Sequence, residues 1–496
     1  MSERKTGVLF HISSLPSPYG IGTFGRSAYE FVDFLTEAGQ TYWQLLPLGP
    51  TSYGDSPYQA FSTFAGNPYF IDLDFLNIDG FLEKSDFENL DWGSNPMYVD
   101  YAHIYENRFA VLRKAYKNFM EKGNVAALKA YCEKESSWLD GYALFMALKN
   151  AHGGKSWREW EKPFYAREEK ALAEFAEANA EELGFWKFLQ YEFNRQWTNL
   201  KNYANERGIK IIGDLPIYVA DDSSDVWANP KLFDFDEERR PRCVAGCPPD
   251  AFSVDGQLWG NPVYDWDYNK ETGYEWWIAR LRACSEKYDI LRIDHFRGFA
   301  GYYCIPYGDT TARNGEWKKG PGMDLFSVVK KELPDCPIIA EDLGFLTDDV
   351  RQLLKDCGFP GMKILEFAFG ADDDANDSLP HNLLRHSVCY PGTHDNPPVG
   401  EWKETLCEKD LKYCMDYMNC KNEDEFIDSF IRMALGTVAE TAIIPMQDWL
   451  GLGKYTRMNT PSTSSGNWQW RLVKDQLKPE LAKYMFELTH LYGRLR

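Results

Sequence analysis

The chain lacks any apolar run of roughly 18 or more residues, the length that a membrane-spanning helix needs. Its first residues, 1–6, include five polar or charged residues after Met1 and lack the apolar segment of a secretory signal. Basic residues are also scarce, with 54 Lys and Arg against 75 Asp and Glu and a formal net charge of −21. We therefore expect a cytoplasmic protein that binds neither nucleic acid nor membranes, because a field of this sign repels anionic surfaces.

The chain has few cysteines for its length, 11 in 496 residues, and they are spread widely rather than gathered at short spacings. This distribution is typical of free thiols in a reducing compartment rather than of a disulfide framework. Cys243 and Cys247 lie close together, but no second cysteine or histidine pair follows nearby. We therefore expect free thiols throughout and no zinc site at this pair.

Aromatic residues, in contrast, are abundant, at 16% of the chain with 17 Trp and 29 Tyr. Most of these rings are expected in the hydrophobic core. Some could instead line a sugar-binding cleft, because a pyranose ring has an apolar C–H face that stacks on an aromatic ring. Composition leaves both interpretations open, and the negative charge does not hinder the binding of a neutral sugar.

Eight short apolar runs separated by helical patterns organise the chain. Most of the runs show no strict alternation, which is typical of parallel strands buried on both faces. Eight such strands alternating with helices predict an α/β fold, a (β/α)8 TIM barrel formed by the whole chain, 1–496. The predicted strands are approximately 7–14, 41–48, 210–219, 290–295, 337–341, 363–369, 387–393 and 441–447.

Two long insertions, after predicted strands 2 and 3, interrupt the regular spacing of the barrel. Residues 49–208 carry a strong helical period and predict an inserted, mostly helical subdomain. Residues 220–267 are rich in Pro, Gly and Trp without a long period, and they predict a loop-rich active-site subdomain. Both insertions follow the carboxyl ends of strands, so we expect them to wall the same mouth of the barrel.

Three carboxylates in the second half of the chain each close an apolar run: Asp294, Glu341 and, more loosely, Asp395. A carboxylate at the end of a buried strand lies at the carboxyl edge of the barrel, where this fold places its chemistry. Cleavage of a glycosidic bond needs an acid for the leaving oxygen and a carboxylate that attacks or stabilises an oxocarbenium-like centre. The alternative is that the three are structural carboxylates paired with neighbours, and the nearby Arg292 is compatible with both interpretations.

Two further motifs suggest other chemistry but have weaker support. Residues 20–25 match GxGxxG, yet the next predicted strand lacks the acidic end that a dinucleotide site needs. His295 and His394 each neighbour a proposed active-site aspartate, as in metal-dependent barrel hydrolases. The first predicted strand, however, has only His11 in place of a His-x-His pair. Hydrogen bonding to substrate hydroxyls is the better role for His295 and His394.

Long motifs along nearly the whole chain resemble those of the 4-α-glucanotransferases, the amylomaltase or disproportionating-enzyme family, also known as glycoside hydrolase family 77. Four of them lie at predicted strand ends, two near the N-terminus and one near the C-terminus. They are GDLPIY at 213–218, LRIDHFRG at 291–298, IAEDLG at 339–344, GTHDN at 392–396, SPYQ at 56–59, AGNPY at 65–69 and GNWQWR at 466–471.

The resemblance implies a role for each of these residue positions. Asp294 would be the nucleophile, Glu341 the general acid/base and Asp395 the transition-state stabiliser. Arg292 would orient Asp294 and keep it ionised, as an adjacent cation does. The residues that would bind substrate are Tyr58, Asp214, Trp259, Arg292 and His394. The family's flexible active-site loop would correspond to residues 246–253, in which Ala251 stands where many members have Tyr.

The reaction that the resemblance implies is transfer of α-1,4-glucan segments between maltooligosaccharides by a retaining double displacement, without cofactor or metal. The three carboxylates alone do not distinguish this enzyme from an α-amylase-type hydrolase, which would use water as the acceptor. A glucan-binding protein without turnover is a more distant alternative, because it would not need all three. We also expect Phe252 to shield the covalent intermediate from water, since it offers an apolar face on a proline-stiffened loop.

Overall fold

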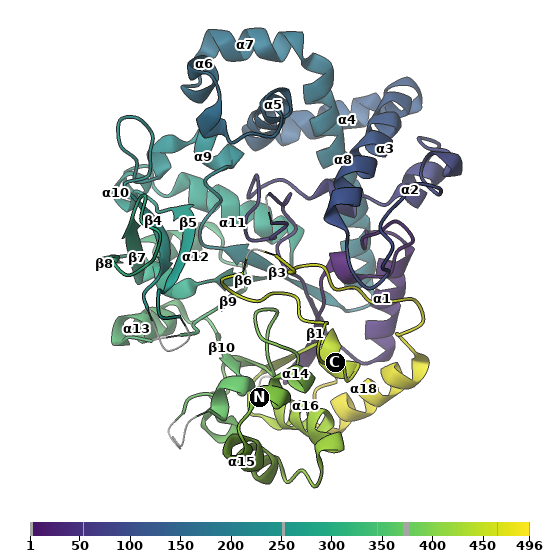
Figure 1. The fold of residues 1–496 in the computed structure, drawn as a ribbon, viewed down its shortest axis with the longest axis vertical. Helices are drawn as coiled ribbons and strands as arrows, with labels where there is room; N and C mark the ends of the chain where they lie inside the picture. Colours follow the sequence, from purple (N-terminus) through teal and green to yellow (C-terminus); the bar gives the residue numbers. More distant parts are fainter. Residues whose placement is uncertain are drawn as a thin grey trace.

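A closed barrel of eight parallel strands lies at the centre of the computed structural model, which describes residues 3–52, 54–249, 253–344, 346–370, 376–463 and 465–495. The strand order around the barrel is β1-β12-β11-β10-β9-β6-β3-β2 (Figure 1). Every one of these strands overlaps one of the eight predicted runs, so the predicted (β/α)8 barrel is confirmed. The strands are β1 (Lys5–Leu9), β2 (Tyr42–Gln44), β3 (Lys210–Pro216), β6 (Ile290–Asp294), β9 (Ile338–Ala340), β10 (Gly361–Ile364), β11 (Ser387–Tyr390) and β12 (Thr441–Pro445).

Amphipathic helices cover the outside of the barrel. In α1, for example, Ala28, Phe31, Val32 and Leu35 repeat at helical spacing, and all four side chains are buried. Strands such as β11 are buried at every position, which explains why their sequences do not alternate. The helices outside the first insertion are α1 (Arg26–Glu37), α9 (Ser224–Ala228), α10 (Trp266–Glu271), α11 (Glu275–Lys287), α12 (Met323–Glu332), α13 (Asp348–Cys357), α14 (Val399–Thr405), α15 (Glu408–Met418), α16 (Phe426–Gly436), α17 (Met446–Trp449) and α18 (Pro479–Leu491).

Residues 49–208 form the helical body at the top of Figure 1. Its longest helix, α8, buries the face that contains Phe185, Phe188, Phe193 and Trp197. The same helix contacts α1 and leads into β3, so the end of this segment also belongs to the helical layer of the barrel. The helices are α2 (Leu73–Ile78), α3 (Tyr101–Lys122), α4 (Val125–Lys134), α5 (Ser136–Ala151), α6 (Lys162–Tyr165), α7 (Glu169–Ala178) and α8 (Ala180–Glu206).

A small antiparallel sheet lies beside the barrel, on the left of Figure 1, in the strand order β5-β4-β7-β8. Residues 220–267 supply β4 (Cys243–Cys247) and β5 (Gln257–Pro262). The segment after β6 supplies β7 (Gly301–Pro306) and β8 (Glu316–Lys319). The sequence pattern predicts loops in 220–267 and misses this sheet, because its strands are short and its central pairing, β4 with β7, joins segments far apart in the chain.

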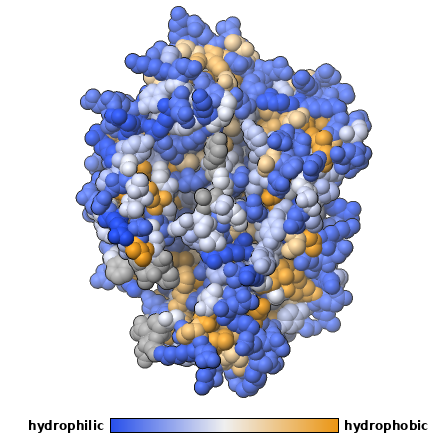
Figure 2. Space-filling model, in the orientation of Figure 1, coloured by the Kyte–Doolittle hydropathy of each residue, from blue (hydrophilic) through white to orange (hydrophobic). Residues whose placement is uncertain are grey.

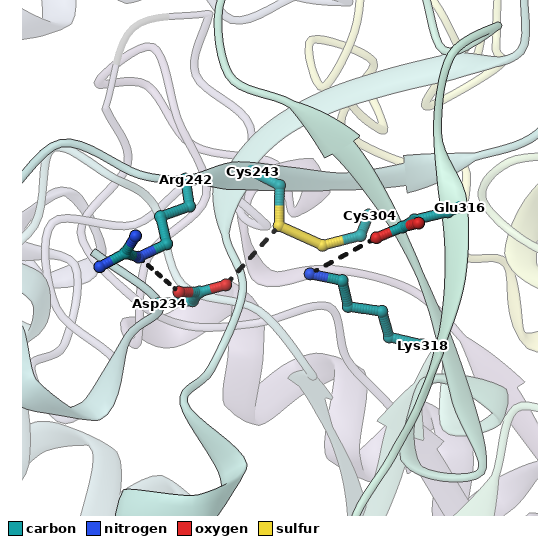
Figure 3. The surroundings of a disulfide bond; sticks show 6 residues. All are labelled: Asp234, Arg242, Cys243, Cys304, Glu316 and Lys318. Atoms are coloured by element: carbon teal, nitrogen blue, oxygen red, sulfur yellow. Dashed lines mark hydrogen bonds and ion pairs between the residues drawn. A yellow bond between two sulfur atoms is a disulfide. The ribbon is translucent and has the colours of Figure 1, made fainter. Parts of the chain in front are cut away.

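A disulfide bond joins Cys243 of β4 to Cys304 of β7 (Figure 3). The prediction of free thiols throughout is therefore wrong for this pair. The antiparallel register sets Ala245 opposite Cys304, which makes Cys243 a diagonal neighbour with a Cα–Cα distance of 5.7 Å. The two residues are 61 positions apart in the chain, so no local spacing pattern could reveal the pairing.

The face of the molecule seen in Figure 2 is largely polar. In the space-filling view, hydrophilic residues cover most of the visible face and apolar residues occur in small separate patches (Figure 2). None of the described helices combines the length and the apolar character that a membrane crossing requires.

Candidate active site

The three predicted carboxylates lie at the carboxyl edge of the barrel. Asp294 is the last residue of β6, and Glu341 directly follows the neighbouring strand β9. Asp395 lies in the loop after β11. The structure brings the three together, close enough that the negative charges of Glu341 and Asp395 both raise the pKa of the Asp294 carboxyl.

Arg292 links two carboxylates inside the barrel. Its Nη1 atom lies 2.6 Å from Asp214 Oδ2 and 3.1 Å from Asp294 Oδ1. The parallel register of β3 and β6 pairs residue 214 with residue 292, which explains the close contact. Arg292 and Asp214 are both buried, so this interaction is shielded from solvent.

Tyr58 connects the first insertion to the barrel mouth. Its hydroxyl donates to Asp214 Oδ2 at 2.8 Å and lies 2.8 Å from His394 Nε2. The Tyr58 hydrogen is used for Asp214, so His394 donates to the hydroxyl oxygen from Nε2. The Tyr58 and His394 rings also stack, with centroids 5.2 Å apart and an interplanar angle of 14°. Burial lowers the pKa of His394, which keeps this ring neutral.

The Glu341 carboxylate is held by two backbone N–H groups. His295 donates to Oε2 at 2.6 Å, and Leu343 donates to Oε1 at 2.9 Å. These contacts fix the orientation of the side chain at the end of β9. Burial raises the pKa of Glu341, while Arg292 and the two N–H groups oppose the rise.

His295 and Trp259 form the wall next to Asp294. The backbone of His295 has φ 54°, a left-handed conformation that is unusual for a non-glycine residue and is often found at functional sites. Trp259 of β5 meets its ring edge-on, with centroids 4.8 Å apart. Burial lowers the pKa of His295 to about 3, and Nε2 has no protein partner among the described residues. The His295 imidazole is thus neutral.

Three residues near Asp395 were missed as individual site residues. Asn459 Nδ2 donates to Asp395 Oδ1 at 2.7 Å, and Arg457 Nη2 donates to the Asp395 carbonyl at 2.6 Å. The Trp468 ring packs near Tyr58, with centroids 5.7 Å apart. Trp468 belongs to the motif at 466–471, but nothing in the local sequence marks Arg457 or Asn459.

The charges at the site favour retention of a proton. Burial raises the pKa of Asp294 well above its ordinary value, and the charges of Asp214, Glu341 and Asp395 act in the same direction. Arg292 opposes this rise, as predicted from the sequence, but its positive charge acts against both burial and the three negative charges. The ion pair with Arg292 favours the ionised form of Asp294, and burial favours the protonated form of Glu341.

Within the described ranges, no group of three or more His, Cys, Asp or Glu side chains is arranged to hold a metal ion. Ala251 and Phe252, in the predicted mobile loop, lie outside the described residues. The role of Phe252 therefore stays a prediction.

Comparison with known proteins identifies the family. A family model described as 4-alpha-glucanotransferase matches residues 10–476. The chain belongs to the 4-alpha-glucanotransferase family. The 4-alpha-glucanotransferase of Clostridium butyricum is 52% identical over 486 residues, which cover 98% of this chain and 99% of the relative. That of Thermus thermophilus is 47% identical, with 96% of each chain covered.

The solved structures agree with this assignment to the 4-alpha-glucanotransferases. Amylomaltase from Streptococcus agalactiae, in complex with acarbose, matches with a TM-score of 0.98 and 45% identity over 100% of both chains. The family resemblance found in the sequence is thus confirmed. In this glucanotransferase chain, one mouth of the barrel gathers all the predicted site residues: Tyr58, Asp214, Trp259, Arg292, Asp294, Glu341, His394 and Asp395.

Proposed function

We propose that the protein transfers α-1,4-glucan segments between maltooligosaccharides by a retaining double displacement. The observation that carries the mechanism is the different environment of two carboxyls at adjacent strand ends. Asp294 lies against a guanidinium at 3.1 Å, whereas Glu341 is oriented by backbone N–H groups. The ion pair suits Asp294 to attack as an anion, whereas burial, which raises the pKa of Glu341, suits the oriented Glu341 to carry a proton.

In the first step, Glu341 protonates the glycosidic oxygen while Asp294 attacks the anomeric carbon. The reducing-end fragment leaves, and a β-linked glycosyl-enzyme remains on Asp294. In the second step, the 4-hydroxyl of an acceptor sugar attacks this intermediate and Glu341 takes up its proton. The product again has an α-1,4 bond, because each step inverts the anomeric centre once.

The other residues at the mouth bind and orient the sugar. Asp395 has a half-exposed carboxylate and would hold ring hydroxyls more strongly as the ring distorts toward the transition state. His394 and Asp214, linked through Tyr58, present polar atoms to the same sugar. Trp259, next to His295, would offer an aromatic face to the sugar.

Incubation with maltotriose tests the reaction class. Transfer produces a ladder of oligosaccharides longer than the substrate, and these can be separated by chromatography. A product set containing only shorter sugars would assign the protein to the hydrolases. Unchanged maltotriose would leave only a glucan-binding role.

Covalent labelling tests the roles of the two carboxylates. In Glu341→Gln, maltosyl fluoride can still load Asp294, because fluoride leaves without an acid, but the absent base slows release. Intact mass spectrometry should show one added maltosyl group, and peptide mapping should place it on Asp294. The double variant with Asp294→Asn is the matched control and should gain no mass. A label on another side chain would contradict the assignment.

A further inference from the structure

Two buried carboxyl side chains flank the segment that carries Asp395. Glu366 lies in the short helix η7 (Leu365–Ala368), directly after β10, and is 4% exposed. Asp448 lies in α17, directly after β12, and is 1% exposed. Strand β11, which leads into residues 391–399, lies between β10 and β12 in the barrel. The two acids therefore approach this segment from its two neighbouring strands.

Glu366 packs against the start of the segment. Its backbone N–H donates to the Pro391 carbonyl at 3.1 Å. Its carboxyl lies against Gly392, where an added Cβ would come within 2.7 Å of Oε1. Asn396 lies beside the same carboxyl, and its Oδ1 accepts from the Thr393 N–H and hydroxyl at 3.0 Å each. The Glu366 carboxyl thus sits on the inner side of this turn.

Asp448 holds the other end of the segment. Its Oδ1 accepts from the Val399 N–H at 2.8 Å, which fixes the start of α14. Its Oδ2 is buried without a hydrogen-bond partner among the described residues, and the side chain of Asn396 is the hydrogen-bonding group beside the buried Glu366 carboxyl. Buried polar atoms without partners are costly for folding, so acids retained at such positions call for a functional explanation.

Burial and nearby charged groups together set the pKa of Glu366. Burial raises the pKa of Glu366 well above its ordinary value, and the negative charges of Asp448 and Glu401 add to the rise. Arg457 and Asn396 act in the opposite direction. Burial also raises the pKa of Asp448 to about 7. Burial and these negative charges therefore favour the neutral carboxylic acid form of Glu366, which can both donate and accept a hydrogen bond.

Arg457 connects this buried pair to the proposed stabiliser. Its positive charge acts on Glu366, while its Nη2 donates to the Asp395 carbonyl at 2.6 Å. Its Nε donates to the Asn459 carbonyl at 2.6 Å, and the Asn459 side chain in turn binds the Asp395 carboxylate. Arg457 therefore fixes the backbone of Asp395 directly and supports its side chain through Asn459, while its charge acts on Glu366.

We propose that Glu366 and Asp448 are positioning residues that hold the 391–399 segment so that Asp395 faces the reacting sugar. This proposal rests on the proposed role of Asp395 as transition-state stabiliser, and it names the side chains that hold Asp395 in position. Neither acid touches substrate, because both lie buried behind the segment. A role in packing alone would need only side-chain volume, whereas this role needs a polar group that holds the turn.

Two substitutions of similar length separate these roles. Glu366→Met keeps the volume but removes the polar atoms, and we expect kcat to fall about tenfold or more while KM stays within about threefold. Glu366→Gln resembles the neutral acid and should keep kcat within about threefold of the wild type. Glu480→Gln, on the exposed start of α18, is the control and should change nothing. Equal kcat values for the Met and Gln variants, each corrected for the folded fraction, would overturn the proposal.

A double-mutant cycle with Asp395→Asn gives the final test. If Glu366 acts through Asp395, Glu366→Met should slow the already impaired Asp395→Asn enzyme by less than about threefold. Additive losses in an impaired Asp395→Asn background would overturn the positioning role and leave the proposed role of Asp395 intact. Near-normal transfer by Asp395→Asn itself would overturn both. Should Glu366→Met fail to fold, Asp448→Leu and Asp448→Asn provide the same comparison from the other side of the segment.

Discussion

Arg292 Nη1 lies 3.1 Å from Asp294 Oδ1 and is also bound to the buried carboxylate of Asp214. One guanidinium thus serves both the buried Asp214 and the proposed reacting carboxylate of Asp294. Since the positive charge lowers the pKa of Asp294 against the effect of burial, it controls how much of the nucleophile is ionised at a given pH.

Replacement of this guanidinium should shift the pH dependence of the reaction. In Arg292→Lys the ammonium cannot keep both contacts, so the pKa of Asp294 should rise. The acidic limb of the kcat/KM profile should then move to higher pH, because Asp294 reacts as the anion. We expect kcat/KM at pH 6 to fall about tenfold or more. Arg313→Lys, an exposed arginine paired with Asp255, is the matched control and should leave the profile unchanged.

Removal of the Tyr58 hydroxyl should weaken substrate use without disturbing the fold. Tyr58→Phe keeps the ring that stacks on His394 but leaves Asp214 and His394 each with one hydrogen bond fewer. The loss of hydrogen bonds in the buried site should cost about 1–2 kcal/mol, or roughly tenfold in kcat/KM for maltotriose. Tyr105→Phe, on the exposed face of α3, should behave as the wild type. A Tyr58→Phe enzyme with unchanged kcat/KM would remove this hydroxyl from the site.

Phe252 is predicted to keep water away from the glycosyl-enzyme. The intermediate must survive water at about 55 M until an acceptor sugar arrives, so exclusion of water decides between transfer and hydrolysis. Phe252→Ser should therefore raise the ratio of reducing ends released to glucosyl units transferred. Val254→Ser, two residues away at a position that is 76% exposed, is the control. If both variants give the wild-type ratio at normal activity, water is excluded by another part of the cleft.

The disulfide between Cys243 and Cys304 should stabilise the small sheet that carries Trp259. The bond closes a loop with a sequence separation of 61 residues. In the chain-entropy model, a loop of this size contributes up to about 4 kcal/mol to the free energy of unfolding. Reductant should therefore lower the Tm of oxidised wild-type protein. The Cys243→Ser/Cys304→Ser variant should have a low Tm that reductant does not change. Equal Tm values for oxidised wild type and variant would contradict a stabilising bond.

Asp225 should make stability depend on pH. This carboxyl accepts from the Thr63 N–H at 2.8 Å and is buried, and burial raises its pKa to about 6. In the unfolded chain its pKa is about 3.9, so the folded state binds the proton more tightly. The resulting stability is fully present below about pH 3.9 and is lost as pH rises through about 6, with a total on the order of 3 kcal/mol.

Asp225→Asn should remove this dependence, because the amide stays neutral and can still accept from Thr63. The free energy of unfolding of the variant minus that of the wild type should increase from pH 4.5 to pH 7.5, as measured by urea unfolding. Asp335→Asn, at an exposed position, should give the same difference from wild type at both pH values. A stability difference between Asp225→Asn and the wild type that is the same at both pH values would contradict the prediction.

The sequence by itself determined the barrel and the proposed reacting groups. Apolar runs such as 387–393 predicted strands because a strand buried on both faces must be apolar throughout, and burial of β11 agrees with this. Asp294 and Glu341 were found because the fold places its chemistry at the carboxyl ends of strands. Tyr58 and Trp259 were assigned by family motifs, since nothing in their local pattern distinguishes a cleft ring from a core ring.

Only the tertiary structure decided which distant residues meet. Cys243 pairs with Cys304, and Asn459 with Asp395, because strand register and barrel closure bring together segments that are far apart in the chain. Glu366 and Asp448 also meet the 391–399 segment only in the folded barrel. Each follows a strand, and no motif in the sequence around it indicates a function. Their protonation depends on burial and on neighbouring charges, which are properties of the folded environment and not of the sequence.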